Sequence, residues 1–299
     1  MIPYEPSELI LNPDGSVFHL HLKPGEVADR IILVGDPGRV DMVGGLLQDV
    51  EFRRENREFV SLTGSYSGAR ITVLSTGIGT DNIDIVMNEL DALVNIDLNT
   101  RLPKKNHTSL RIVRIGTSGA LQPDLPTGSW ISSGISVGLD GLMNYYPLGK
   151  RYAEPELISL LKACEWWPES LPLPYAYRCG HPFETGKTEK LHWGITITAH
   201  GFYAPQGRCL RAGVSHPDLN RHLTTFGYNG LMVTNFEMES SALYGLSDLL
   251  GHESLTICLI VANRIRKQFL EDYHPAMLEL VIYVLDHFTA APSHERNAS

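Results

Sequence analysis

Glycine, small hydroxyl residues and arginine recur where apolar runs of the chain end. They appear in "GDPGR" (35–39), "STGIGTDN" (75–82), "RIGTSGA" (114–120) and "NR" (263–264). Backbone N–H groups, hydroxyls and guanidinium groups together bind oxyanions. Arg114 interrupts the apolar run "LRIVRIG", where an unpaired guanidinium would be costly, so it needs an anion. A salt bridge to a core acid would satisfy Arg114 alone, but Arg39 at an equivalent strand end favours a shared inorganic anion.

The segment "NFEMESSA" (235–242) places Glu237 and Glu239 on either side of Met238, with no lysine nearby. A carboxylate can accept two hydroxyl hydrogen bonds at once, as the vicinal diol of a ribose would offer, and Met238 would give the sugar an apolar floor. The alternative is that either carboxylate caps the helix that follows. Side-chain direction predicts that at most one of the two carboxylates enters a site.

A third group of residues lies in "TAHGFYAPQGR" (198–208). Phe202 can stack on a planar ring, while Gln206 offers a donor and an acceptor and Arg208 offers donors only. The hydrogen-bonding edge of uracil matches these donors and this acceptor better than the edge of adenine does. The alternative is a loop that Phe202 and Tyr203 anchor in the core.

Several other kinds of chemistry lack their motifs. No P-loop is present, no GxGxxG opens a helix, and no GxSxG elbow is found, which disfavours nucleoside triphosphates, NAD and acyl transfer. The twelve histidines form no HxxxH or HExxH pattern, so no transition-metal site is expected. The cysteines are widely spaced and are expected to be reduced; they are Cys164, Cys179, Cys209 and Cys258.

Composition indicates one globular domain. Hydrophobic residues make up 43% of the 299 residues, and the formal net charge of -9 disfavours nucleic acid and anionic membranes as partners. The start of the chain lacks the features of a signal peptide and no apolar run reaches membrane-spanning length, so a cytoplasmic location is expected. We predict an amino-terminal arm (1–16), a domain (17–290) and a disordered tail (291–299).

The candidate residues must be positioned by an alternation of strands and helices. Runs that are apolar on both parities predict buried strands at 30–36, 69–77, 110–119 and 254–263. Helical periodicity predicts helices at 38–48, 82–97, 154–166, 237–250 and 275–288. This alternation indicates an α/β fold with a mainly parallel sheet, in which ligands bind beyond the carboxyl ends of the strands. Segments 97–109 and 166–187 are expected to be loops.

Taken together and in this order, the motifs resemble the nucleoside phosphorylase-I family, and within it the members that act on uridine. The resemblance runs through "VFHLHL" (17–22), "GDPGRV", "NREF" (56–59), "STGIG", "RIGTSGALQ", "FYAPQGR", "NFEMESSAL" and "ANR". It implies a single α/β domain with a mixed central β-sheet flanked by helices, of the phosphorylase/hydrolase-like kind.

The resemblance also implies a role for individual residues. The phosphate-binding positions are Gly35, Arg39, Arg114 and Thr117, with Arg57 contributed by a neighbouring subunit. The ribose-binding positions are Met238 and Glu239, with His19 reaching the sugar 5'-hydroxyl across the subunit interface. The base-binding positions are Ser118, Gly119, Phe202, Gln206, Arg208 and Arg264, and a monovalent cation such as K+ would lie at Glu58, Ile71 and Ser75. Arg39, Arg114, Glu239 and Arg208 would carry the catalysis.

The implied reaction is the reversible phosphorolysis of uridine to uracil and ribose 1-phosphate in pyrimidine salvage. Phosphate is the co-substrate and no organic cofactor is needed. Purine-specific relatives carry an acidic residue near the last strand, whereas this chain has Arg264 in "VANR". Residues shared across an interface imply a homodimer, or a hexamer built from dimers. The alternatives are a purine nucleoside phosphorylase, a hydrolytic nucleosidase and a catalytically silent nucleoside-binding protein.

Overall fold

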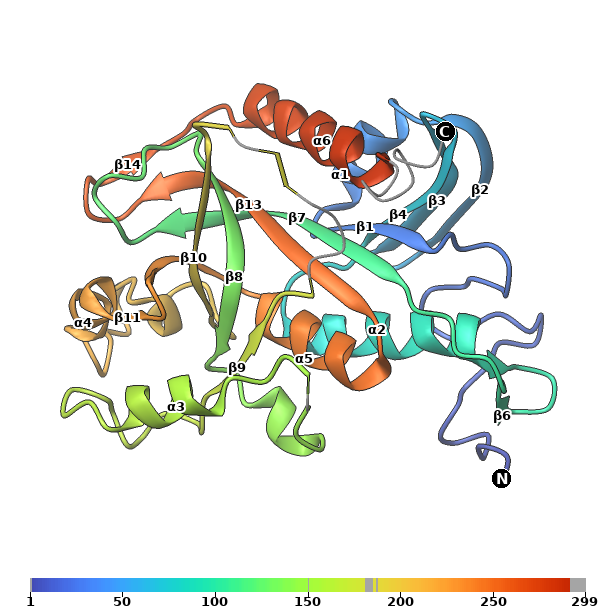
Figure 1. The fold of residues 1–299 in the computed structure, drawn as a ribbon, viewed down its shortest axis with the longest axis horizontal. Coiled ribbons are helices and arrows are strands. Elements are labelled where there is room, and N and C mark those ends of the chain that lie inside the picture. Colours follow the sequence, from blue (N-terminus) through green and yellow to red (C-terminus); the bar gives the residue numbers. More distant parts are fainter. Residues whose placement is uncertain (1, 150, 181–184, 187, 291–299) are drawn as a thin grey trace, which may run out of the picture.

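The computed structural model describes residues 2–149, 151–180, 185–186 and 188–290; the predicted tail 291–299 lies outside this range. Its centre is a large mixed β-sheet with helices on both sides, α1 and α6 on one and α2 and α5 on the other (Figure 1). The predicted α/β class is therefore confirmed.

The four strands predicted from apolar runs form the middle of this sheet. They are β1 (Arg30–Val34), β4 (Ala69–Ser75), β7 (Arg111–Ala120) and β13 (Glu253–Asn263). All three pairings in the order β13-β7-β1-β4 are parallel. Their side chains are buried on both parities because helices cover both faces, which explains the absence of a polar alternation in the sequence.

Further strands, most of them in antiparallel pairings, extend the sheet at both ends of this parallel core. They are β2 (Gln48–Asn56), β3 (Phe59–Tyr66), β8 (Trp130–Gly138), β9 (Tyr175–Arg178), β10 (Leu191–Thr198), β11 (Gly227–Tyr228), β12 (Leu231–Glu237) and β14 (Gln268–Phe269). Within this set the β10 pairings with β8 and β12 are parallel. The end of β12 also pairs antiparallel with the end of β7, Asn235 opposite Ala120. The sheet is therefore curved, so that the carboxyl end of β12 lies against the carboxyl end of β7.

Five of the six α-helices described lie where periodicity predicts them, with corrected ends, whereas no helix was predicted at the position of α4. They are α1 (Pro37–Gly44), α2 (Thr80–Asn95), α3 (Pro155–Lys162), α4 (Leu219–Thr225), α5 (Ser240–Leu250) and α6 (His274–Thr289). Helix α5 does not begin at residue 237, because Glu237 is the last residue of β12 and Glu239 is the N-cap. It ends at Gly251, whose φ of 76° is the left-handed conformation that glycine adopts readily.

The two predicted loops are partly regular. Segment 97–109 contains one strand of a small hairpin and the end of the other, β5 (Ile96–Asp97) and β6 (Leu102–Pro103), and segment 166–187 contains β9. The amino-terminal arm is tied to this hairpin, since the N–H of Tyr4 donates to the carbonyl of Arg101. Among the helices described, none has the length and apolar character to cross a membrane.

Candidate active site

A cavity of about 680 Å³ opens where the carboxyl ends of β1, β4, β7, β12 and β13 meet. Its walls come from the loops after β1, β4 and β12, from β7 itself and from segment 202–208. Most of the predicted site residues line it: Gly35, Arg39, Arg114, Thr117, Ser118, Gly119, Phe202, Gln206, Arg208, Met238 and Glu239. The structure thus gathers into one cavity residues that are about 200 positions apart in the chain.

Arg39 is positioned by the abrupt turn from β1 into α1. Asp36 is the N-cap of α1 and accepts from the N–H of Gly38 at 2.9 Å, while Pro37 begins the helix. The Arg39 guanidinium donates to the carbonyl of Ile115 at 3.2 Å, and its Nε makes no hydrogen bond within the described residues. Burial, and then the charge of Arg114, lower the pKa of Arg39 from its ordinary value. A bound anion would offset both the burial of the Arg39 charge and its repulsion by Arg114.

Arg114 lies in the middle of β7 rather than near its end, because the strand continues through "GTSGA" to Ala120. Its side chain is buried, contacts Glu239 and lies 3.3 Å from Glu237. Against the effect of burial, these two carboxylates raise the pKa of Arg114 above its ordinary value. A side chain at Gly116 would lie 2.3 Å from Arg114 Nη1, so glycine is what leaves room for the guanidinium.

Glu237 and Glu239 both line the cavity, and the expectation that at most one of the two carboxylates enters the site stays a prediction. Glu237 ends a strand, and Glu239 has φ -140° and ψ -29°, so strand alternation does not decide which way the two side chains point. Glu237 also fits the capping alternative, since its Oε2 accepts from the N–H groups of Glu239 and Ser240, each at 2.9 Å. Glu239 Oε1 accepts from the N–H of Gly79 at 2.8 Å.

Gln206 lies at the end of the cavity away from Arg39 and Arg114, where several polar contacts converge on it. It closes a short 3-10 helix (Ala204–Gln206), and its Oε1 accepts from Arg208 Nη1 at 2.8 Å and from Arg264 Nη2 at 2.6 Å. With both lone pairs of Oε1 occupied, Gln206 presents its amide nitrogen as a donor. Arg264 does not line the cavity but acts on it through Gln206, and burial followed by the charge of Arg208 lowers the pKa of Arg264 to about 10.

The aromatic residues of this segment lie at the surface. Phe202 is 51% exposed and Tyr203 is 55% exposed, so the alternative of a loop anchored in the core by these two residues is wrong. The guanidinium carbon of Arg208 lies 3.7 Å from the centroid of the Phe202 ring. This cation–π contact holds Phe202 at the cavity, where its face can stack on a planar ring.

The residues expected to cross a subunit interface do not line the cavity of their own chain. His19 Nδ1 lies 2.7 Å from Glu89 Oε1, and Arg57 lies in the turn between β2 and β3 with φ 55°. Of the cation positions, Ser75 is close to Glu58, because its hydroxyl donates to the Glu58 carbonyl at 2.6 Å, while Ile71 is fully buried in β4. The roles of all five residues stay predictions.

The sequence reading missed several residues of the cavity. Phe269 comes from the two-residue strand β14 and carries no sequence signal, whereas Glu237 and Ile78 lie inside motifs that were recognised. Val261 and Ala262 also line the cavity, and they precede the "NR" motif. Apolar residues at a strand end look the same in sequence whether they pack in a core or face a cavity.

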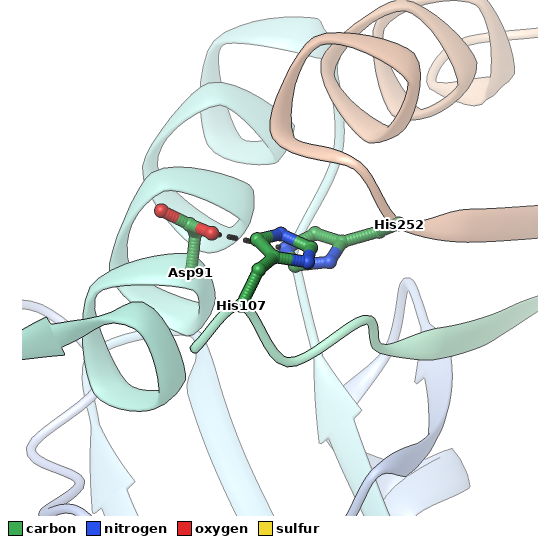
Figure 2. A group of neighbouring side chains, drawn as sticks. All are labelled: Asp91, His107 and His252. Atoms are coloured by element: carbon green, nitrogen blue, oxygen red, sulfur yellow. Dashed lines mark ion pairs between the residues drawn. The ribbon is translucent and has the colours of Figure 1, made fainter. Parts of the chain in front are cut away.

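A second cluster lies outside the cavity, where Asp91 of α2, His107 and His252 come together (Figure 2). Local histidine spacing could not reveal it, because the three residues come from separate segments. The N–H of Leu110 donates to His252 Nδ1 at 3.1 Å, which assigns the proton of a neutral ring to Nε2. Nε2 lies 3.3 Å from Asp91 Oδ1, although the contact does not have hydrogen-bond geometry. A metal would need the lone pair at Nε2, so this geometry favours a structural histidine–aspartate pair.

Comparison with known proteins agrees with this geometry. The family model of the phosphorylase superfamily matches residues 29–285. A uridine phosphorylase of Thermococcus kodakarensis is 31% identical over 86% of this chain and 80% of its own, and a DeoD-type purine nucleoside phosphorylase of Geobacillus sp. is 29% identical over 81% and 84%.

Among solved structures, a nucleoside phosphorylase of Trypanosoma brucei, described as showing uridine phosphorylase activity, superposes with a TM-score of 0.79. It is 28% identical, and the match covers 93% of this chain and 99% of that one. The extent of these matches and the cavity built from the same motifs lead to one conclusion: the chain belongs to the phosphorylase superfamily.

Proposed function

We propose that this chain is a uridine phosphorylase, which converts uridine and phosphate reversibly into uracil and ribose 1-phosphate. The observation that carries this proposal is a single cavity with buried Arg114 and partly buried Arg39 at one end and the Gln206 amide at the other. Glu239 contacts Arg114 at the arginine end and lines the same cavity, so it can accept from the ribose diol of a nucleoside bound there.

In the proposed reaction, Arg39 and Arg114 hold phosphate below C1' of the sugar, with Arg57 of the partner subunit on the same anion. A phosphate oxygen forms a bond to C1' while the bond from C1' to N1 of the base breaks, and its electron pair leaves with uracil. Positioning the nucleophile in this way is worth several kcal/mol, on the order of 7–11 in favourable intramolecular cases. Glu239 fixes the sugar, and fixed positive groups stabilise the leaving anion.

The base end supports a pyrimidine. Gln206 presents an N–H donor that suits a carbonyl oxygen, and Arg264 Nη2 and Arg208 Nη1, at 2.6 Å and 2.8 Å from Gln206 Oε1, place positive charge where the uracil anion forms. A purine leaving group calls instead for an acid that protonates its imidazole ring, and the position after β13 is an arginine. The relatives also include purine nucleoside phosphorylases, so purine phosphorolysis is the second candidate.

We also propose a homodimer as the smallest active unit, with a hexamer built from dimers as the larger assembly. This would bring His19 and Arg57 of one subunit to the cavity of its partner. A monovalent cation such as K+ at Glu58, Ile71 and Ser75, and a cytoplasmic location, belong to the same proposal.

Initial rates with uridine, thymidine and inosine at saturating phosphate test the choice of base. A preference for uridine or thymidine over inosine is expected. A preference for inosine would overturn the assignment of the base end and make the chain a purine nucleoside phosphorylase.

A further inference from the structure

The two carboxylates that contact Arg114 are held in different ways. Glu237 is fixed by its surroundings: its Oε1 accepts from the Thr198 hydroxyl at 2.5 Å, and its Oε2 accepts from two backbone N–H groups at the start of α5. Glu239 Oε1 accepts from the N–H of Gly79, the Met238 backbone also interacts with the carboxylate, and Glu239 Oε2 contacts Arg114. Glu237 is therefore a permanent neighbour of Arg114, whereas the contact of Glu239 Oε2 with Arg114 is one that a competing ligand can replace.

The pair formed by Arg114 and Glu239 conflicts with the tasks proposed for each residue. Arg114 must bind phosphate, and Glu239 must accept from the ribose diol, yet each now satisfies the other. Arg114 is 4% exposed and Glu239 is 3% exposed, so each has little access to water when the pair separates. Separating buried charges is costly unless each finds a new partner. Phosphate offers that partner to Arg114, and the sugar hydroxyls offer it to Glu239.

We propose that phosphate displaces Glu239 from Arg114 and thereby prepares Glu239 for the sugar, while Glu237 holds the guanidinium in place during the exchange. Glu237 is then a positioning residue, and binding of phosphate and nucleoside is cooperative. This inference rests on the proposed function, because it assumes that both ligands use the one cavity. By linkage, each ligand strengthens the binding of the other by the same factor.

The test is calorimetric titration of the full chain with pseudouridine, whose carbon–carbon glycosidic bond phosphate does not cleave, with and without saturating phosphate. We expect phosphate to tighten pseudouridine binding by a factor of roughly 5 to 150, the usual range for coupled sites. Two ligands that bind with unchanged affinities in each other's presence would overturn the inference and leave the function intact. Failure of both ligands to bind would instead contradict the proposed function.

Two variants of equal size separate the roles of the carboxylates. Glu239→Gln removes the charge that competes with phosphate, so phosphate should bind several-fold tighter and the coupling should shrink. Glu237→Gln removes the charge that stays with Arg114 throughout, so phosphate should bind more weakly. A purely structural role would weaken phosphate binding in both variants, and that result would overturn the inference.

A matched control exists elsewhere in the chain. Glu154 is also buried and is paired with Arg178, outside the cavity. Glu154→Gln makes the same chemical change and should leave the coupling factor at its wild-type value. A loss of coupling in this variant as well would show that the effect is a general consequence of removing a buried charge, and would overturn the assignment to Arg114.

Discussion

The two ends of the cavity are built differently. At the phosphate end, Arg114, Glu237 and Glu239 come from a central strand and from the junction of β12 with α5, and each is less than 5% exposed. At the base end, Phe202 and Arg208 flank a short 3-10 helix, and Phe202 is half exposed. In the proposed function, the scaffold therefore fixes the anion site, while a surface segment recognises the base.

The largest effect is expected at the phosphate end. Arg114→Ala should lower kcat/KM by about 10² to 10³, because a preorganised charge is lost, and should raise the KM for phosphate. It also leaves two buried carboxylates without their cation, which costs about 3 to 5 kcal/mol of stability in comparable cases.

Arg114→Lys is the matching variant, since it keeps the positive charge and loses the bidentate contact that a guanidinium can make with an anion. It should fold and still bind phosphate weakly. Steady-state kinetics and thermal melts of both variants check this prediction, and a normal phosphate KM in folded Arg114→Ala would remove the residue from the anion site.

A smaller effect is expected at Gln206. Gln206→Glu retains an acceptor for Arg208 and Arg264 but loses the amide donor, so a base carbonyl would face a carboxylate oxygen. A buried polar group of the substrate that loses its matched partner in the site binds much more weakly. We therefore expect kcat/KM for uridine to fall by about 10 to 10². The KM for phosphate should stay unchanged. A change in the phosphate KM as large as that in the nucleoside KM would erase the distinction between the two ends.

The ends should also differ in their response to acid. Burial, and then the charge of Glu237, raise the pKa of Glu239 above its ordinary value of 4.5, against the pull of Arg114. As the pH falls through this raised pKa, Glu239 gains a proton and accepts less well from the diol. Pseudouridine affinity, measured without phosphate, should therefore fall by up to about tenfold per pH unit below it.

Free uracil is the control for this pH dependence, because it lacks the sugar. Its affinity should stay constant over the same range, since Arg208 and Arg264 keep their charge in acid. An equal loss of uracil affinity would place the titrating group at the base end instead.

The smallest effect is expected for Phe202→Ala. A stacking contact contributes about 0.5 to 1.5 kcal/mol, so kcat/KM for uridine should fall by a factor of roughly 2 to 10 with stability unchanged. Because the ring is half exposed, little core packing is lost. Melting temperatures measured beside the kinetics check this, and a strongly lowered melting temperature would return Phe202 to a core role.

Sequence was sufficient for the parts of the fold that depend on local pattern. The four central strands could be predicted because they are buried on both faces. Helix α2 could be predicted because one of its faces is buried, and the apolar residues of that face are Ile83, Val86, Met87, Leu90 and Leu93. That Arg114 needs an anionic partner could be predicted because charge inside an apolar run is costly, and Glu237 and Glu239 are the partners that the structure supplies. Where α5 begins could not be predicted, since that depends on Glu237 accepting from the backbone rather than on periodicity.

The remaining parts depend on contacts between distant segments. Phe269 reaches the cavity only because β14 folds back on β13, and no local pattern indicates it. The pairing of His252 with Asp91 likewise joins residues 161 positions apart, so spacing rules for histidine could not find it. The pairing of the end of β12 with the end of β7 brings the segment of Glu237 and Glu239 to the cavity, and side-chain alternation alone does not indicate this.

The most direct test of the account is to follow uridine turnover with and without phosphate while measuring uracil and ribose 1-phosphate together. The account predicts no uracil release when phosphate is withheld, and one ribose 1-phosphate for each uracil when it is supplied. Uracil release with free ribose, at a rate that does not depend on phosphate, would contradict it, because Arg39 and Arg114 would then not bind the nucleophile.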